Sequence, residues 1–459
     1  MIFAKSDYLI IIRDFLKLLK WISFLFLPPL VVALIFREEV FWIFMVEFLS
    51  ILALGKFTEN LIKVEKDTKF KHAFILVGLI WLFVAGLASL PFLFLGVGFV
   101  DAFFESVSAL TTTGFTIFLN LDNLPYSILF WRSFMQWIGG IGIVVAVLGG
   151  AFRIGGLAFY IAEGREEKIK PNIINTVKII WKIYIFYTLL GILMLYLFGM
   201  PLFDSVNHAM TAIATGGMSV RDISQYSFGI HLTLMVLMLL GATSFYTHYL
   251  LFSRKFGEAL KDIQLHFLIF LILFSFFILA FKSSAYFENL FHVISAITCT
   301  GFGLSPLSAL DDFSKQVLIG LMVIGGAAGS TAGGIKIIRL IVILKSIKLQ
   351  LKKILTPNLV EYPKIYGKII EDEASKNIFL FVLAYLLLLG FGSMVLTFIG
   401  YPLIDALFEV ASAQGNVGLS VGIAEKLPSL GKIILIINML LGRLEIWAML
   451  VLGSLIFRR

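Results

Sequence analysis

The chain has 459 residues, of which 59% are hydrophobic and only 14% are charged. A soluble protein of this length carries about 25% charged residues, so the composition excludes an ordinary soluble protein and favours a membrane protein. The net charge is +8, but the basic residues lie mostly in short loops, so membrane topology explains them and no nucleic-acid partner is expected. One cysteine excludes an internal disulfide and any metal site built on cysteines.

Ten segments are apolar and long enough to cross a membrane, for which roughly 20 residues are needed. In chain order they are 8–36, 40–62, 73–98, 127–160, 174–199, 229–252, 264–282, 314–350, 376–399 and 430–456. The first is expected to be a retained helix, because no cleavage signature of a signal peptide follows it. The eighth is too long and too rich in glycine to be one simple span.

Lysine and arginine assign the two sides of the membrane. They are concentrated at the N-terminus, in alternate loops, over 336–376 and at the C-terminal Arg458-Arg459 pair. With ten spans, all these segments lie on one side, which the positive-inside rule makes the cytoplasm. The opposite loops carry few positive charges, namely Arg37, Arg221, Lys315, Lys426 and Lys432. The sequence therefore predicts a multi-pass protein of the cell membrane, surrounded by lipid, with both termini cytoplasmic.

Four polar runs interrupt the apolar chain on the external side. They are SALTTTGFT at 108–116, TAIATGGMS at 211–219, SAITCTGFG at 295–303 and SAQGNVGLS at 412–420. The runs align without gaps on a central glycine, which is Gly114, Gly217, Gly301 or Gly418. Serine or threonine lies six positions earlier, and an acid lies thirteen positions earlier, namely Asp101, Asp204, Glu288 and Asp405. This agreement indicates a fourfold internal repeat.

Each repeat predicts a spanning helix, a half-helix, an extended polar run and a second spanning helix. The half-helix is too short to cross, and non-helical backbone inside a membrane is tolerated only when it is buried in protein or lines a watery path. The four acids are expected in the first turns of the half-helices, as helix caps, as a ring that collects cations, or as both. Consecutive runs are separated by two spans, so the repeats are parallel, whereas secondary transporters often have inverted repeats.

The extended runs can offer backbone carbonyls in place of the water shell of a cation. A central glycine permits positive φ and close approach of the backbone, which fits a carbonyl-lined filter. For any one run the alternative is a helix–loop junction with a C-cap glycine, and the fourfold alignment argues against it. The expected cation-binding residues are Thr112, Thr113, Gly114, Thr215, Gly216, Gly217, Cys299, Thr300, Gly301, Asn416, Val417 and Gly418.

The eighth segment departs from the repeat because it contains ten consecutive small residues, GGAAGSTAGG, at 325–334. We expect an unwound loop inside the membrane that can move across the path below the filter. The alternative is close packing of helices through small residues. The expected gate residues of this loop are Gly325, Gly326, Gly329, Gly333 and Gly334.

Arg443 lies within the last predicted span, where an arginine is costly and is a candidate functional residue. If it faces the path, its charge limits cation flow and it belongs to the gate. The alternative is a structural ion pair, with Glu445 as a nearby acid, although residues i and i+2 do not face each other on a helix. Counted from the central glycines, the matching positions in the other repeats are Gly139, Ala242 and Gly326.

Two further pairs of residues have open interpretations. His208 and His292 lie nine positions before the central glycines, where the other repeats have Glu105 and Glu409. We interpret the histidines as packed half-helix residues rather than proton relays. Lys336 and Arg339 follow the glycine-rich loop and mark either the cytoplasmic boundary or a contact with a partner.

The motifs TTTGFT, TCTGFG, STAGGIKIIR and LGRLEIW resemble those of the Trk/Ktr/HKT superfamily of potassium transporters, closest to the TrkH-type membrane subunit. The resemblance covers nearly the whole chain, as an N-terminal helix pair over 1–71 and four helix–pore-loop–helix units over 72–165, 166–260, 261–355 and 356–459. It implies an all-α polytopic membrane protein with a pseudo-fourfold pore, a gating loop in the third unit, and no enzymatic activity.

The same resemblance implies potassium as the substrate, held at the filter residues only, and no cofactor in this chain. It also implies a homodimer and a cytosolic nucleotide-binding regulatory subunit of the TrkA/KtrA type. No GxGxxG motif follows a strand-like segment, so that domain must lie on a separate chain.

The polar runs also resemble the TVGYG filter of tetrameric potassium channels, but its second glycine survives only as Gly303, which implies looser selectivity. The alternative function is an ion-coupled secondary transporter, a cation symporter with discontinuous helices. No HExxH or cysteine-based site supports an intramembrane enzyme.

Overall fold

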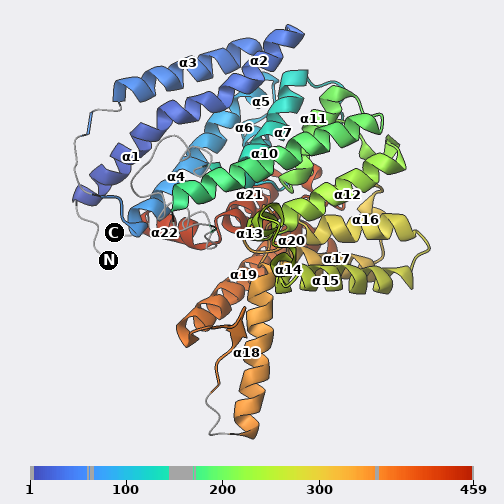
Figure 1. Cartoon of the computed structure of the whole chain (residues 1–459). Helices are drawn as coiled ribbons and strands as arrows, with labels where there is room; N and C mark the ends of the chain where they lie inside the picture. Colours follow the sequence, from blue (N-terminus) through green and yellow to red (C-terminus); the bar gives the residue numbers. More distant parts are fainter. Residues whose placement is uncertain are drawn as a thin grey trace.

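The computed structural model describes residues 5–58, 61–62, 67–143, 169, 172–356 and 361–456. Regular structure in these ranges is helical apart from a hairpin of two short antiparallel strands, β1 (Lys364–Ile365) and β2 (Lys368–Ile369). Figure 1 shows long helices inclined side by side, with both chain ends on the same side of the molecule. The predicted all-α architecture is confirmed.

An N-terminal segment precedes the four repeats. It consists of α1 (Lys5–Ser23), the 3-10 turn η1 (Phe24–Phe26), α2 (Leu27–Phe36) and α3 (Phe41–Thr58). Helices α1 and α3 pack along each other, and Gly55 permits this because a Cβ there would lie 2.5 Å from the backbone nitrogen of Lys20. Asp7 pairs with Lys71 at 2.6 Å and with His72 at 2.8 Å, which ties α1 to the first repeat.

Each repeat contains an outer helix, a half-helix and an inner helix. The outer helices are α4 (Phe70–Ala88), α10 (Ile173–Leu197), α15 (Ile263–Ala280) and α19 (Asp372–Ile399). The half-helices are α6 (Phe99–Leu110), α11 (Leu202–Ile213), α16 (Tyr286–Ile297) and α20 (Leu403–Gln414). The inner helices are α7 (Tyr126–Ile141), α12 (Phe228–Ala242), α17 (Asp312–Ile324) and α21 (Ser429–Arg443).

Shorter elements complete the chain. The helix α5 (Leu90–Phe94) follows α4, and the 3-10 turns η2 (Ile223–Gln225), η3 (Leu307–Ala309) and η4 (Ala424–Lys426) precede the inner helices of repeats two to four. After the inner helices come α13 (Phe245–Phe252), α14 (Phe256–Ala259), α18 (Ile337–Leu355) and α22 (Trp447–Ile456).

Local sequence explains where many helices begin. Prolines, which lack the N–H that a first turn leaves unpaired, lie directly before four helices, as Pro125, Pro201, Pro402 and Pro428. The side chains of Asn172, Asp262 and Asp311 instead accept hydrogen bonds from the N–H groups that begin α10, α15 and α17.

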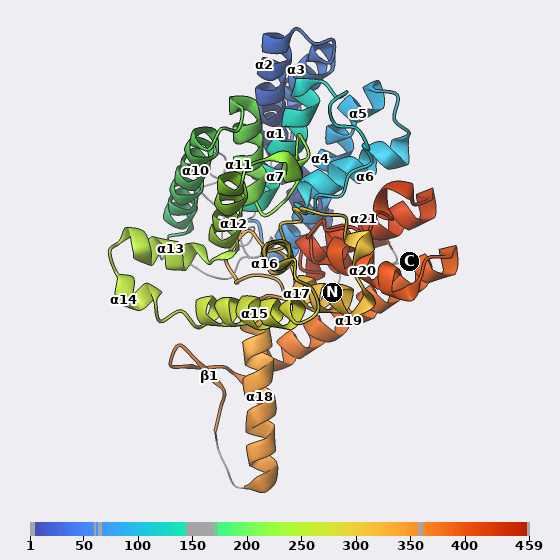
Figure 2. The same ribbon diagram turned by 90° about the vertical axis from the view of Figure 1, so that its right-hand side faces the viewer.

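The four repeats pack in a closed cycle. The inner helix of each repeat contacts the half-helix of the next, as α7 with α11, α12 with α16, α17 with α20 and α21 with α6. Each half-helix also packs against the outer helix of its own repeat. Figure 2 shows part of this arrangement, with α11, α12, α16 and α17 toward the middle and the outer helices α10 and α15 on their outer side. The predicted fourfold arrangement of parallel repeats is therefore present.

Six of the ten predicted spans match a continuous apolar helix of at least 18 residues, as 8–36, 40–62, 73–98, 174–199, 264–282 and 376–399. Two others were wrong as single spans. The segment 229–252 is broken between α12 and α13, which are bent by 103°, and 430–456 is broken between α21 and α22, which are bent by 115°.

Of the last two, the span predicted at 127–160 begins with α7, and its part after 143 lies outside the described residues. The span predicted at 314–350 is divided into α17 and α18 by a non-helical segment over 325–336. This confirms that the eighth segment is not a simple span. Helix α18 projects away from the four repeats, as both views show (Figures 1 and 2).

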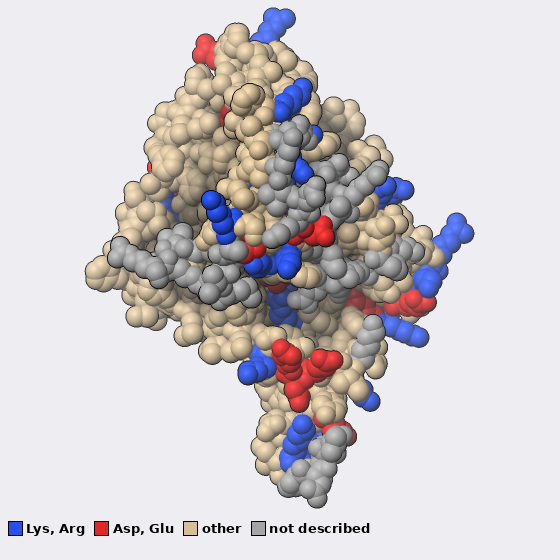
Figure 3. Space-filling view, turned by 90° about the vertical axis from the view of Figure 1, so that its left-hand side faces the viewer, with Lys and Arg blue, Asp and Glu red and all other residues tan. Residues whose placement is uncertain are grey.

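The outer helices expose large apolar side chains, as expected of a surface that faces lipid. Examples are Phe270, Phe274 and Phe277 on α15, which are 54–58% exposed. A water-soluble surface does not present contiguous apolar patches of this kind. The face on the side of the chain ends, by contrast, carries lysine and arginine together with acidic residues (Figure 3).

Candidate functional site

The four half-helices bring the polar runs to the centre of the molecule. Each half-helix has 12 residues, which corresponds to about 18 Å and is too short for a hydrocarbon layer of about 30 Å. The chain leaves the helical path after Leu110, Ile213, Ile297 and Gln414. The prediction of a half-helix followed by an extended run is therefore confirmed in all four repeats.

The backbone of the polar runs repeats one unusual conformation. Two positions before the central glycines, φ is 59° at Thr112, 53° at Thr215, 56° at Cys299 and 53° at Asn416. The glycines themselves have φ of 98°, 70°, 91° and 93°. Positive and negative φ thus alternate, which turns successive carbonyl groups to the same side of the chain. Left-handed backbone is costly for residues that carry a Cβ, and such residues gather at functional sites.

The central glycines close the four runs into a ring. A Cβ at any of them would lie within 3.0 Å of a carbonyl oxygen of the next repeat, in the pairs Gly114 with Gly216, Gly217 with Thr300, Gly301 with Val417, and Gly418 with Thr113. The fourth repeat thus meets the first. A side chain at a central glycine would displace the neighbouring carbonyl group, because real Cβ atoms essentially never approach this closely.

Hydrogen bonds from the half-helices hold each run in place. The N–H group just before each central glycine donates to the carbonyl of Ser108, Thr211, Ser295 or Ser412 at 2.8–2.9 Å. The hydroxyl groups of Ser295 and Ser412 also accept from the N–H groups of Gly301 and Gly418, at 3.1 and 3.0 Å. The serine or threonine of the repeat therefore anchors the strained backbone.

The position nine residues before the central glycine braces the returning chain. Its side chain accepts a hydrogen bond from the N–H group three residues after the glycine in three repeats, through Glu105, His292 and Glu409 at 2.8, 3.1 and 2.9 Å. Arg132 of α7 pairs with Glu105 at 2.7 Å. In the second repeat, His208 is buried and its Nδ1 lies 2.8 Å from the Asp204 carbonyl oxygen. Both histidines are packed in the half-helices.

The four repeat acids lie in the first turns of the half-helices, as predicted, but they do not cap them. The N-cap residues are Gly98, Pro201, Ala285 and Pro402, and none forms a side-chain cap bond. Instead, Asp101 pairs with Lys432 of the fourth repeat at 2.6 Å, and Asp405 pairs with Lys315 of the third at 2.8 Å. Asp204 accepts from Tyr226 at 2.7 Å within its own repeat. Two of the acids therefore link neighbouring repeats.

All four inner helices end at a similar position within their repeats, which the sequence analysis did not predict. They end at Ile141, Ala242, Ile324 and Arg443. An interruption was expected only in the eighth predicted span, 314–350, yet the predicted spans 229–252 and 430–456 are broken as well. The break is a shared feature, and what distinguishes the third repeat is the length of the non-helical segment that follows.

The first repeat is out of register with the others by one residue. Helix α7 begins 12 residues after Gly114, whereas the other inner helices begin 11 residues after their central glycines. Gly139 and Gly442 both pack against the carbonyl four residues before a central glycine, which makes them equivalent. Matching Arg443 with Gly139 was therefore wrong, and Arg443 corresponds to Gly140.

The segment 325–336, called the crossing loop below, is fixed by hydrogen bonds to the second repeat. Thr331 donates from its backbone and from its hydroxyl to the Gly241 carbonyl, at 3.1 and 2.8 Å, and its hydroxyl also lies 3.1 Å from the Ile213 carbonyl oxygen. On the other side, Gly333 packs against the Gly415 carbonyl of the fourth repeat. The loop thus extends between two repeats beside the start of their polar runs.

Arg443 links the fourth repeat to the first and third. Its guanidinium donates to the carbonyls of Gly139 and Gly140, the latter at 3.0 Å, and to the Thr331 carbonyl at 3.2 Å. These carbonyls belong to the last turn of α7 and to the crossing loop, where a positive charge is favourable. Glu445 pairs with Arg339 instead. The alternative of an Arg443–Glu445 pair is therefore replaced by contacts with backbone carbonyls.

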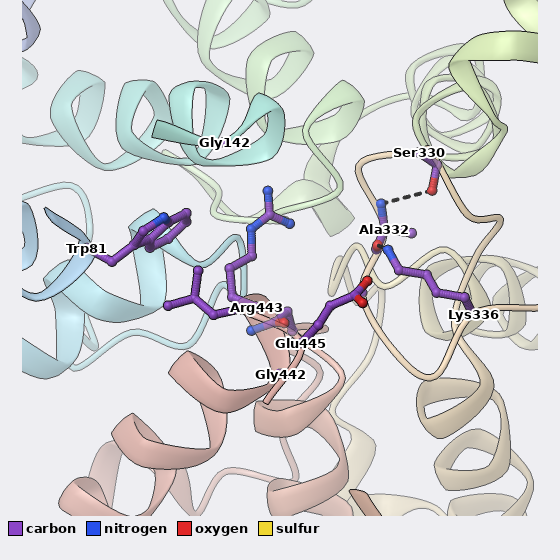
Figure 4. A pocket seen from close by; sticks show the side chains of 12 residues that line it. Trp81, Gly142, Ser330, Ala332, Lys336, Gly442, Arg443 and Glu445 are labelled. Carbon is purple, nitrogen blue, oxygen red and sulfur yellow. Dashed lines mark hydrogen bonds between the residues drawn. The ribbon is translucent and has the colours of Figure 1, made fainter. Parts of the chain in front are cut away.

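Arg443 also lines a cavity next to the polar runs. The volume that the centres of water molecules can occupy in this cavity is about 30 Å³. Its wall includes Asn416 of the fourth run and Gly329, Gly333 and Lys336 of the crossing loop. Figure 4 shows Arg443 extending toward α7 near Gly142, with Trp81 to one side of it and Glu445 directed toward the loop. The predicted gate residues Gly329, Gly333 and Arg443 therefore share one cavity.

Several residues of this centre were missed by the sequence analysis. Lys315 and Lys432 were counted only as external charges, although both occupy the fourteenth position after a central glycine. That shared spacing, combined with the repeat acids, was a signal for ion pairs between repeats. Gln136, a buried polar residue of α7, also touches the second run, with its amide nitrogen 2.6 Å from the Gly216 carbonyl oxygen.

The arrangement suits an unhydrated cation better than a chemical reaction. The four runs meet at their central glycines, and each run follows the C-terminal end of its half-helix, where the backbone carries partial negative charge. Within the described ranges, no group of three or more histidine, cysteine or acidic side chains is placed to hold a metal ion.

Comparisons with known proteins agree with this geometry. A profile of the TrkH family, described as a cation transport protein, matches residues 37–284 and 281–457. An uncharacterized cation transporter of Methanocaldococcus jannaschii is 37% identical over 444 residues, which cover 94% of this chain and 92% of that protein. The Trk system potassium uptake protein TrkH of Salmonella typhimurium is 32% identical, with 94% and 95% of the two chains covered.

A solved structure is similar over the same extent. The crystal structure of the potassium transporter TrkH from Vibrio parahaemolyticus superposes with a TM-score of 0.87 at 31% sequence identity, covering 98% of this chain and all of that one. The fold class predicted from the sequence is thereby confirmed. The chain is a polytopic, non-enzymatic membrane protein, and it belongs to the TrkH family of cation transport proteins.

Proposed function

We propose that this protein takes up potassium across the cell membrane through the ring of polar runs, which acts as a selectivity filter. The observation that carries the proposal is the closed ring of central glycines, each packed against a carbonyl of the next repeat. Four chemically equivalent carbonyls at one level replace water around a cation of fitting size. Relatives named as potassium uptake proteins support potassium as the ion.

The proposed filter residues are the twelve named from the sequence, and potassium is expected at these residues only. Twelve residues in four runs provide a few stacked layers of carbonyls. All four runs have the first glycine, but three carry Thr116, Ser219 or Ser420 where a second glycine would stand. We therefore expect potassium preference with some passage of sodium.

The proposed gate is the crossing loop together with Arg443. Both lie directly below the ring and border the same cavity. The parallel, cyclic order of the repeats supports a pore over the alternative of a symporter, in which inverted repeats are common. We take the units 72–165, 166–260, 261–355 and 356–459 as the pore repeats, and the side of the chain ends as cytoplasmic.

Two partners belong to the proposal. Helix α18 projects from the repeats with Leu344, Ile347 and Leu351 about half exposed, which gives a second copy of the chain an apolar surface in a homodimer. The neighbouring lysines, including Lys348 and Lys352, suit a cytosolic regulatory subunit of the TrkA/KtrA type. Light scattering of the purified protein should give twice the protomer mass.

The direct test is uptake of radioactive rubidium, a potassium substitute, into liposomes that contain the purified protein. An outward potassium gradient should drive uptake, external potassium should compete strongly, and sodium should compete weakly. Electrical recording from single molecules separates the two mechanisms, because discrete currents require a pore. Equal competition by potassium and sodium would overturn the assignment of a potassium filter.

A further inference from the structure

One polar side chain of an inner helix is built into the ring. Gln136 of α7 is fully buried. Its amide nitrogen donates to the Gly216 carbonyl at 2.6 Å, and its amide oxygen accepts from the N–H of Met218 at 3.0 Å. A Cβ on Gly216 would lie within 3.0 Å of the Gln136 amide group. The glutamine therefore occupies the space in which a side chain at position 216 would stand.

Comparison of the four repeats shows that Gln136 and Gly216 both differ from the residues at the equivalent positions of the other repeats. With the one-residue offset of the first repeat, Gln136 corresponds to Met238, Met322 and Met439, and all four side chains are buried. Gly216 corresponds to Thr113, Thr300 and Val417. When each inner helix is matched with the run of the next repeat, three of the four pairs combine a methionine with a β-branched residue just before the central glycine. Gln136 replaces this methionine in the first inner helix, and it lies against Gly216, which replaces the β-branched residue in the second run.

We propose that Gln136 is a positioning residue that sets the selectivity of the filter by holding the Gly216 carbonyl. The proposal rests on the function proposed above and goes beyond it, because it assigns a residue outside the polar runs. Gly216 has the least restricted backbone of the four equivalent positions, since it carries no Cβ. The amide of Gln136 supplies the restraint that Thr113, Thr300 and Val417 obtain from their own side chains.

The chemistry of an amide fits this task. One group must donate to a carbonyl and accept from an N–H group two residues further on, which an amide does and a thioether or carboxylate does not. A carbonyl oxygen has two lone pairs, so Gly216 can accept from Gln136 and still face a cation. The hydrogen bond limits how far this carbonyl can move toward a smaller ion such as sodium.

The experiment measures the potassium-to-sodium permeability ratio of reconstituted Gln136→Met and Gln136→Glu proteins. Gln136→Met installs the residue of the other repeats and removes both hydrogen bonds. Gln136→Glu keeps the size and the acceptor for Met218 but removes the donor to Gly216. Each should lower the ratio about fivefold, as expected when a buried polar group loses its partner. A ratio unchanged in both variants would overturn the proposal.

A double variant separates positioning from simple loss of structure. Gly216→Thr alone places a side chain where Gln136 stands, and it should lower the ratio as strongly as Gln136→Met does. Together, Gln136→Met and Gly216→Thr reproduce the composition of the other repeats, and the ratio should return to within about twofold of the wild-type value. If the two losses add instead of cancelling, the residues do not act as a pair and the proposal fails.

Two controls keep this result apart from the filter assignment itself. Met238→Leu changes the equivalent buried residue of the second repeat without removing a side-chain hydrogen bond, and it should leave the ratio unchanged. Gly217→Ser tests the filter directly. If Gly217→Ser lowers the ratio and the Gln136 variants do not, only the role of Gln136 is wrong. If none of these variants changes the ratio, the filter lies elsewhere.

Discussion

The ring of polar runs and the region below it are made from the same four repeats, yet they differ in symmetry. In the ring, every repeat has the same alternation of φ and the same contact with the next repeat. Below it, α7 is braced by Arg443, α12 and α21 lead into sharply bent helices, and α17 leads into the crossing loop. The repeated pattern is therefore kept in the ring and abandoned below it.

This difference follows from what each region has to do. A cation at the centre of a ring interacts with all four runs at once, so a change in one run alters the whole coordination shell. A barrier in a path does not have to be present in all four repeats, and here the crossing loop comes from the third repeat and Arg443 from the fourth. Changes in the ring should therefore affect selectivity, and changes below it should affect the rate of flow.

The largest effect is expected for Arg443→Gln, which removes the charge below the ring. For a charge roughly 8 Å from the ion and an effective dielectric constant of about 20, the repulsion is about 2 kcal/mol, or about 30-fold in rate. Basal rubidium flux without any partner protein should rise by this factor. The permeability ratio of potassium to sodium should stay the same.

Arg443→Lys is the matched control, because it keeps the charge but loses the planar fork that binds several carbonyls. Flux that stays low in the lysine variant and rises in the glutamine variant assigns the barrier to charge. A flux that rises equally in both variants would assign the barrier to the contacts with Gly139, Gly140 and Thr331. Flux at the wild-type level in both would place the barrier elsewhere. Deletion of residues within 325–334 should raise the flux in the same way.

A change in the ring should instead alter the potassium-to-sodium permeability ratio. Gly217→Ser places a Cβ within 3.0 Å of the Thr300 carbonyl oxygen at a φ of 70°. Displacement of one carbonyl in a shared layer should lower the potassium-to-sodium ratio about tenfold, which corresponds to about 1.4 kcal/mol. Bi-ionic reversal potentials measure this ratio directly.

The control is Gly303→Ser, two residues after the third central glycine. A Cβ there has no neighbour closer than 3.8 Å, and serine is the residue found at this position in the second and fourth repeats. Its ratio should therefore fall much less than that of Gly217→Ser. If both serine variants lower the ratio equally, close packing of the central glycines is not what determines selectivity.

A smaller effect is expected when the crossing loop is loosened. Thr331→Val removes hydroxyl bonds to the Gly241 and Ile213 carbonyls, each worth about 1 kcal/mol. Basal flux should rise about fivefold with unchanged selectivity. Ser330→Ala, in which the lost hydroxyl contacts Ala327 and Ala332 of the same loop, should leave the flux nearly unchanged. A rise in both variants would point to general softening of the loop.

The smallest effect is expected for Cys299→Thr, which places in the third run the residue found at the same position in the first and second. The potassium-to-sodium ratio should stay within about twofold, since backbone carbonyls and not this side chain face the ion. Silver ions, which bind the single thiol of the chain, should inhibit the wild type and spare the variant. Full inhibition of Cys299→Thr would show that silver acts somewhere else.

The parts of the site that the sequence revealed are the local ones. The central glycines, the serine or threonine before them and the four acids recur at fixed spacing, because each sits in one half-helix and its own run. Their conformations depend on residues a few positions away. The crossing loop was visible for the same reason, since ten small residues cannot pack as an ordinary helix.

Interactions between repeats were not visible in this way. The pairs Lys432 with Asp101 and Gln136 with Gly216 join residues 331 and 80 positions apart. The bends after α12 and α21 also escaped detection, because each helix pair is apolar enough as a whole to be taken for one span, and no proline or glycine marks the break between Ala242 and Phe245. Hydropathy reports that a segment is buried in lipid or protein, and it does not report its direction.

The sequence alone determined that this is a membrane protein of parallel repeats with four polar runs, because apolar length, charge placement and glycine spacing are local properties of the chain. Only the tertiary structure decided what those runs touch. Closure of the ring, the one-residue offset of the first repeat and the position of Arg443 against α7 and the crossing loop all depend on how helices from different repeats pack. The physical reason is that packing joins surfaces in space, and the chain order carries no record of which surfaces will meet.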